Sequence, residues 1–199
     1  MRAKELRDLI ISALVLAVAF GIALSGGYRG FQRLDILIIV IGISLVAVSL
    51  SFVFHELAHR LIARRFGYFA EYAMWGKGLL IALGCSFFGF IFAAPGAVMI
   101  HPRTSAWGTS GLGQRRIGLI SLAGPATNIA LVLIFQVLDF TNPTLLFTLG
   151  AQINTWLALF NLIPFGPLDG TKIFKWNKVA WIISIVVAGG LFAAQRFFL

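Results

Sequence analysis

Long apolar runs constrain this chain more than any other feature of its sequence. Five stretches, at about residues 9–25, 36–65, 115–138, 144–168 and 177–197, approach or exceed the ~20 residues that a helix needs to cross the hydrocarbon core of a bilayer. Hydrophobic residues make up 59% of the chain and charged residues 12%, whereas a soluble domain carries about 25% charged residues. We therefore expect an all-α polytopic membrane protein, embedded in the lipid bilayer as a single domain over residues 1–199.

The segment between the second and third of these runs, residues 66–114, is irregular. Residues 68–75 are rich in aromatic side chains and are bounded by glycines, which favours a short strand. Residues 79–100 are apolar enough to span a membrane, but three glycines and a proline interrupt them. The expected fold is a bundle of about five to six spanning helices, with a re-entrant or short β segment between the second and third spans.

The net charge of +9 reflects basic residues that flank the apolar runs, where anionic lipid headgroups attract them. This placement indicates membrane topology and argues against a nucleic-acid partner. If the N-terminus is cytoplasmic and 66–114 begins and ends on that side, only Arg29, Arg33 and Arg196 lie outside. The other thirteen of the sixteen basic residues are then cytoplasmic: Arg2, Lys4, Arg7, Arg60, Arg64, Arg65, Lys77, Arg103, Arg115, Arg116, Lys172, Lys175 and Lys178. Because short cytoplasmic loops are enriched in Lys and Arg, we expect this orientation in a cell membrane.

The sequence His55-Glu56-Leu57-Ala58-His59 lies inside the second apolar run. Helical residues four apart are ~6 Å apart along the axis and ~40° apart around it, so both imidazoles can bind one metal ion. Glu56 can then reach a water molecule at that metal as general base, which is the His-Glu-x-x-His arrangement of zinc proteases. Chance matches are common in soluble helices, but ionisable residues inside a span cost ~2.5–3.5 kcal/mol to insert and are functional by default.

A hydrolytic zinc ion needs three protein ligands and an open position, and the chain has only seven acidic residues from which to draw a third ligand. Glu5, Asp8, Asp35 and Asp139 lie at span ends or turns, where a solvated role is sufficient, and Glu71 lies in the expected strand. Asp169 ends the fourth apolar run, in a segment that two prolines and two glycines interrupt. Unwound backbone there can direct a carboxylate inward. We therefore expect one Zn²⁺ per chain, bound by His55, His59 and Asp169.

Taken together, these motifs resemble the site-2 protease family of intramembrane zinc metalloproteases. The resemblance rests on three segments: His55-Glu56-Leu57-Ala58-His59, Asn161…Pro164…Asp169-Gly170 and Ala123-Gly124-Pro125-Ala126-Thr127-Asn128. It implies peptide-bond hydrolysis within the membrane, an unwound fourth span that supplies Asp169, and a site nearer the cytoplasmic face. It also implies a role for Asn161 in binding the substrate or the developing oxyanion. The expected partner is a membrane-protein or peptide substrate, and no feature of the sequence specifies an oligomeric state.

Two other functions use the same residues. A membrane metal-ion transporter could bind its cargo with the same three ligands, but it would not need Glu56 as a base, and transporters usually show inverted repeats. A catalytically silent relative could bind membrane proteins without cleaving them. The presence of Glu56 argues against a silent relative, because loss of this general base is the simplest way for such a protein to lose its catalytic activity.

The position of Asp169 constrains residues 79–100. A full crossing by this segment would invert the third span and place Asp169 at the opposite face from the histidines. We therefore predict a re-entrant hairpin that turns between Gly84 and Gly89, covers the cleft and has both ends on the cytoplasmic side. The strand expected at 68–75 could bind an extended peptide along its edge. Asn128 and Asn154 are expected to pair between helices.

Overall fold

The structure, a computed structural model, describes residues 2–101, 104–105, 108–109 and 113–198. Arg103, one of the basic residues expected on the cytoplasmic side, lies outside this part. Five helices among the described residues are long and apolar enough to cross a membrane. They are α1 (Ala3–Leu24), α2 (Leu34–Arg65), α4 (Gln114–Thr141), α5 (Leu145–Leu162) and α7 (Lys178–Phe198). The expected all-α polytopic bundle is thus confirmed.

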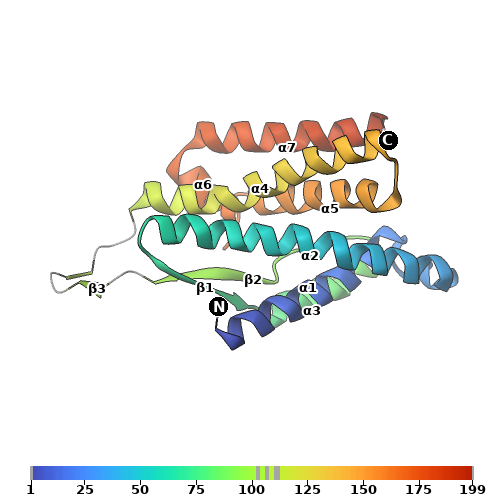
Figure 1. Cartoon of the computed structure of the whole chain (residues 1–199), viewed down its shortest axis with the longest axis horizontal. Coiled ribbons are helices and arrows are strands. Elements are labelled where there is room, and N and C mark those ends of the chain that lie inside the picture. The colour runs from blue at the N-terminus through green and yellow to red at the C-terminus, as the bar shows by residue number, and fades with distance from the viewer. Residues whose placement is uncertain (1, 102–103, 106–107, 110–112, 199) are drawn as a thin grey trace.

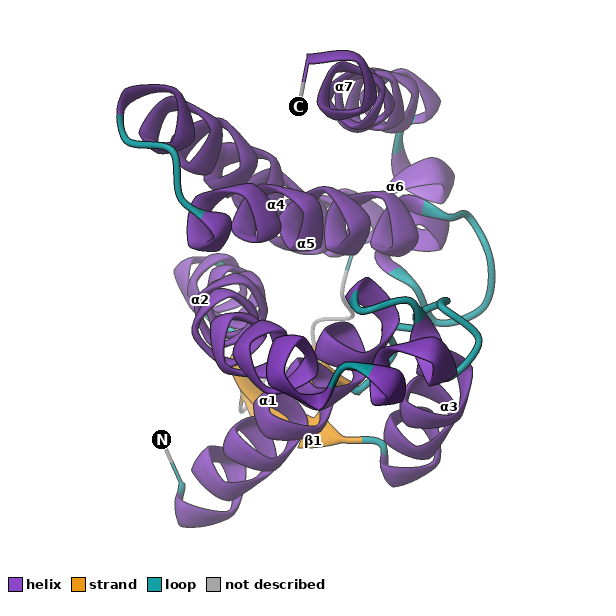
Figure 2. Ribbon diagram, turned by 90° about the vertical axis from the view of Figure 1, so that its right-hand side faces the viewer, coloured by secondary structure: helices purple, strands orange, loops and turns teal. Residues whose placement is uncertain are grey.

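The long helices lie side by side along the longest axis of the molecule (Figure 1). Seen from the end, α1, α2 and a short helix, α3 (Gly76–Ser86), form one group, and α4, α5 and α7 form the other (Figure 2). Helix α2 joins the groups because it packs against α1, α4 and α5. Large apolar side chains such as Ile38, Val137 and Val186 remain exposed on the outside, as expected for helices that face lipid.

The fourth apolar run is not one continuous helix. Helix α5 ends at Leu162, residues 163–168 are non-helical, and a short helix, α6 (Asp169–Trp176), follows. Pro164 and Pro167 cannot donate the backbone hydrogen bonds that a continuous helix needs, and Gly166 has a φ of 59°, which glycine adopts without strain. The unwound span expected from the family resemblance is therefore present, and Asp169 is the first residue after it.

Residues 66–101 form a hairpin, which includes the segment 79–100 for which the sequence predicted one and also the strand expected at 68–75. Strand β1 (Phe69–Met74) leads into α3, the chain turns at Gly89, and irregular backbone returns to β2 (Gly96–His101), which pairs antiparallel with β1. The backbone N–H of Trp75 donates to the Pro95 carbonyl over 2.7 Å, so the two arms remain joined beyond the strands. The short β segment is therefore confirmed, and the segment begins and ends at the same end of the bundle (Figure 1). A second pair, β3 (Thr104–Ser105) with β4 (Gly108–Thr109), follows.

The tip of the hairpin is attached to the connection between α1 and α2, which contains a 3₁₀ helix, η1 (Gly27–Gln32). The N–H of Tyr28 donates to the carbonyl of Phe87 over 2.8 Å. The rings of Phe31 and Phe87 stack with their centroids 5.7 Å apart. The hairpin therefore runs along the bundle from β1 to the connection between α1 and α2, and its turn at residues 87–89 lies at the end of the range predicted from the sequence.

Helix α1 covers the outer edge of β1. Glu5 accepts a hydrogen bond from the backbone N–H of Tyr72 (3.3 Å) and pairs with Arg60 at 3.1 Å. The Tyr72 hydroxyl is hydrogen-bonded to Ser12 over 2.9 Å. The prediction of solvated roles for Glu5, Asp8 and Asp139 is wrong, because all three are buried. Each carboxylate accepts hydrogen bonds from, or pairs with, a group on the chain, which stabilises it without water.

Candidate metal centre

Helix α2 brings His55 and His59 to one face, towards the interior of the bundle. Their side chains are buried, with 4% and 5% of the residue surface exposed, and their Nε2 atoms lie 3.0 Å apart. The four-residue spacing thus places both rings as the helical geometry requires. Two imidazole nitrogens that meet in an apolar interior form a natural pair of metal ligands.

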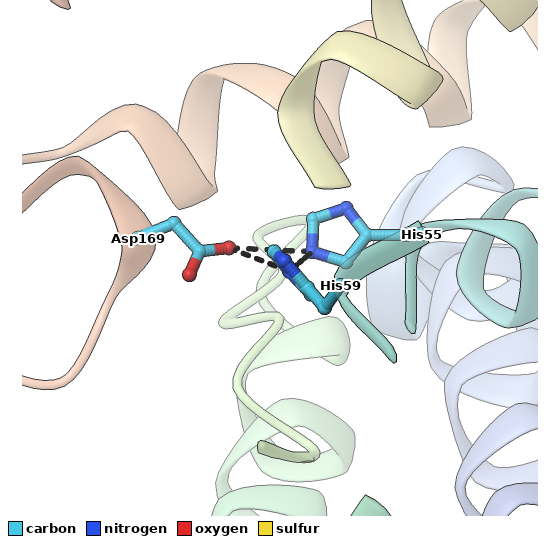
Figure 3. Close-up of side chains that lie close together, drawn as sticks. All are labelled: His55, His59 and Asp169. Carbon is cyan, nitrogen blue, oxygen red and sulfur yellow. Dashed lines mark hydrogen bonds and ion pairs between the residues drawn. The ribbon is translucent and has the colours of Figure 1, made fainter. Parts of the chain in front are cut away.

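Asp169 approaches the histidine pair from the start of α6. Its Oδ2 atom lies 3.4 Å from Nε2 of His55 and 3.0 Å from Nε2 of His59 (Figure 3). The helix break after Leu162 makes this approach possible, because a continuous α5 would carry residue 169 past the site. The structure therefore brings together the three side chains that the sequence predicted as ligands.

The donor set fits a zinc ion. Ligand atoms at about 2.0–2.1 Å from a tetrahedral zinc ion lie about 3.3 Å from one another, and the three pairs of atoms here are 3.0, 3.0 and 3.4 Å apart. Two imidazoles and one carboxylate leave a fourth position free, as in catalytic zinc sites.

Each of the three side chains is also held from behind. Nδ1 of His55 contacts Oδ1 of Asn128, and Nδ1 of His59 contacts the Ile120 carbonyl at 2.7 Å. Such acceptors hold the ring proton on Nδ1 and leave Nε2 free to bind a metal. Oδ1 of Asp169 lies 3.4 Å from Nζ of Lys172, which leaves Oδ2 directed at the histidines.

Asn128 is the site residue whose role sequence reasoning missed. The expected pairing between Asn128 and Asn154 is present, with Nδ2 of Asn128 donating to Oδ1 of Asn154 over 2.9 Å. Asn154 in turn donates to Oγ of Ser51 over 2.7 Å. All three side chains are fully buried. This network connects α2, α4 and α5 and ends on a metal-facing histidine, so it orients His55 as well as joining helices. A polar residue inside an apolar run was the available signal.

Glu56 lies next to this centre without joining it. The residue is 7% exposed, and its Oε2 atom has no hydrogen-bond partner within the described part of the chain. A buried carboxylate oxygen without a partner is costly. A water molecule bound at the metal would provide one, which is the arrangement that a general base requires.

A cavity of about 580 Å³ opens onto the centre. His55, Glu56, His59 and Asp169 line it on one side, with Asn161 and Lys172 beside them. Residues 93–100 of the hairpin line it on the other side, so the segment predicted to cover the cleft does so. The Nδ2 group of Asn161 donates to the Leu157 carbonyl over 2.9 Å, which fixes its amide at the wall of the cavity.

Comparisons with known proteins give two named relatives. The chain is 39% identical over 186 residues to "Putative zinc metalloprotease MJ0611" of Methanocaldococcus jannaschii, and the match covers 90% of this chain and 88% of that protein. It is 31% identical over 145 residues to "Putative zinc metalloprotease Rip3" from each of two strains of Mycobacterium tuberculosis. This match covers 67% of this chain and 31% of that protein. No protein-family model matches the chain, and no solved structure is significantly similar to it.

Proposed function

The chain belongs to the site-2 protease-like family of zinc metalloproteases, and from this premise we propose that it is an intramembrane endopeptidase, which hydrolyses peptide bonds within membrane-spanning segments of other proteins. One observation carries the proposal. A buried His55–His59–Asp169 cluster, with Glu56 beside it, faces a cavity between helices long enough to cross a membrane. Ionisable residues in such a position are functional by default.

His55, His59 and Asp169 would hold the metal ion. A bound zinc ion supplies Lewis-acid chemistry, lowering the pKa of a water molecule and polarising the scissile carbonyl. Glu56 accepts the proton of the attacking water and delivers it to the amine that leaves when the C–N bond breaks. The unpartnered Oε2 atom of Glu56 is available for both transfers.

Asn161 and the hairpin would act on the substrate. The amide of Asn161 lies in the wall of the cavity and can donate a hydrogen bond to the oxyanion that develops on the carbonyl. The substrate helix must unwind, since its own hydrogen bonds shield its peptide bonds. Glu5 and α1 occupy the outer edge of β1, so we place the extended peptide along β2, whose residues line the cavity.

We further propose that the protein spans the cell membrane with its metal centre towards the cytoplasm. The N-terminal ends of α1, α4 and α7 and the C-terminal end of α2 lie at one end of the bundle (Figure 1). Basic residues gather in these ends, among them Arg7, Arg65, Arg116 and Lys178. An excess of basic residues favours the cytoplasmic side.

The test uses the full chain purified in detergent. Bound metal is measured by elemental analysis, and cleavage is measured on a reporter protein with a single membrane span, with and without a chelator and after zinc is restored. We expect about one zinc ion per chain, chelator-sensitive cleavage inside the span, and recovery with zinc. Zinc flux into liposomes without cleavage would identify a transporter. Zinc binding with neither cleavage nor flux would identify a silent relative.

A further inference from the structure

The junction between α5 and α6 is close-packed at the backbone. Leu162, the last residue of α5, is fully buried. A methyl group on Gly170 would lie 2.1 Å from the Leu162 carbonyl oxygen, so the first turn of α6 rests directly on the end of α5. Asp169 precedes Gly170, and its position therefore depends on where that carbonyl is held.

Helix α7 holds this carbonyl. The indole Nε1–H of Trp181 donates to the Leu162 oxygen over 2.7 Å. The last carbonyls of a helix have no partner within it, and Pro164 and Pro167 remove donors from the segment that follows. The Trp181 ring also meets Phe174 of α6 edge-to-face, with centroids 5.2 Å apart. One side chain of α7 thus contacts both sides of the break.

The geometry points to Trp181 as a positioning residue for Asp169, and so for the metal: α7 fixes the end of α5 and the start of α6, and thereby directs the carboxylate at His55 and His59. This inference rests on the proposed metal centre. In the described structure, α7 contributes no side chain within bonding distance of the three ligand groups. The inference nevertheless makes α7 part of the catalytic unit. Asn128 and Ile120 contact the histidines directly and Lys172 contacts Asp169 directly, whereas Trp181 acts on Asp169 through the backbone of the α5–α6 junction.

A matched comparison is available in the same region. Trp176, at the end of α6, packs its ring against Gly118 of α4, where a methyl group would lie 2.4 Å from the ring. The Trp176 atoms nearest Gly118 are carbons, Cδ2 and Cγ of the ring and Cβ, whereas Trp181 acts through its N–H. Trp176→Phe and Trp181→Phe therefore make the same chemical change at neighbouring sites of half-buried tryptophan.

The experiment measures loss of zinc from the full-length protein to a chromogenic chelator, at a temperature well below the unfolding midpoint of every variant. Removing a group that is hydrogen-bonded to a metal ligand typically weakens metal binding 10–100-fold, and Trp181 acts one step further out, through the Leu162 carbonyl, so we take the lower end of this range. We expect zinc to leave Trp181→Phe about tenfold faster than wild type, and to leave Trp176→Phe at the wild-type rate. The thermal midpoints of the metal-free proteins are measured in parallel.

A second variant protects the test against misfolding. Replacing Trp181 by 3-benzothienylalanine keeps the bicyclic ring and removes only the N–H, and it should also release zinc about tenfold faster. An unchanged rate in this variant overturns the inference, as does equal acceleration in Trp176→Phe. Wild-type protein that holds zinc but cleaves nothing would refute the proposed function and leave the inference standing. If the protein cleaves the reporter but its rate of zinc loss does not depend on Trp181, the inference is refuted and the proposed function stands. If the chain binds no zinc, both are refuted.

Discussion

Gly124 of α4 lies against the metal-facing nitrogen of His59, so that a methyl group on Gly124 would be 2.4 Å from Nε2 of His59 and 2.5 Å from Nε2 of His55. Beside the two Nε2 atoms there is thus no room for a side chain at position 124. Real Cβ contacts do not come this close, so any larger residue must displace the imidazoles or occupy the place of the metal.

Gly124→Ala should therefore lose zinc and activity while the bundle still folds. Metal content after gel filtration and the circular-dichroism spectrum measure the two effects. Gly42→Ala is the control, because Gly42 is also helical and its methyl group would meet no atom within 4 Å. Stoichiometric zinc in Gly124→Ala would show that the metal is held elsewhere.

Glu56→Gln should abolish cleavage and leave about one zinc ion per chain. The change removes a base but no ligand, and general acid–base catalysis contributes about 10²–10⁴-fold to rate. We expect a loss of at least about 100-fold in kcat for the reporter substrate. Undiminished cleavage by a preparation with full zinc would remove Glu56 from the mechanism.

Asp169→Ala and Asn161→Ala should separate the roles of ligand and substrate contact. Asp169→Ala leaves two histidines, an incomplete site, and should lose both tight zinc binding and activity. Asn161→Ala should keep the metal and lose about 100-fold in rate, as expected for an oxyanion donor. Metal analysis and kinetics on the same preparations decide it. Equal zinc loss in both variants would contradict this division. Stoichiometric zinc in Asp169→Ala would mean that another residue is the third ligand, and Glu71 and His101 would then be the next carboxylate and imidazole to test.

Asn128→Ala should weaken zinc binding about 10–100-fold, because Nδ1 of His55 loses its acceptor. The neighbouring variant Thr127→Ala is the control, since the one partner of the Thr127 hydroxyl among the described residues is the Ala123 carbonyl of its own helix. Competition titration with a zinc chelator gives both affinities. An equal fall in the two variants would mean that Asn128 acts through general packing of α4.

Local pattern explains what the sequence could predict here. The pairing of the two histidines could be predicted because it depends only on helical spacing within one segment. The helix break before Asp169 could be predicted because prolines and glycines interrupt the helix at their own positions. The partners of those ligands come from distant segments. Nothing in the sequence distinguishes the Ile120 carbonyl or the Trp181 indole from others, because every backbone carbonyl can accept a hydrogen bond and every indole can donate one. Burial of Glu5 was missed for the same reason: its partner Arg60 is fifty-five positions away, and only the packing of α1 on α2 brings them together.

The sidedness of the hairpin is the prediction on which the whole topology depends. Strands β1 and β2 pair antiparallel, and Asp169 meets the histidines of α2, so the third span must begin on the side where α2 ends. We therefore expect cysteines at His101 and at Gly113, each in a Cys85→Ser background, to react with a membrane-impermeant maleimide only from the cytoplasmic side. Cys85 is the sole cysteine of the chain, so each variant carries a single thiol.

A cysteine at Tyr28, in the connection to which the hairpin tip is attached, should react only from outside and serves as the opposite control. Labelling at 113 from outside alone would mean that residues 79–100 cross the membrane fully. Because that crossing would carry Asp169 to the far face from His55 and His59, it would overturn this topology.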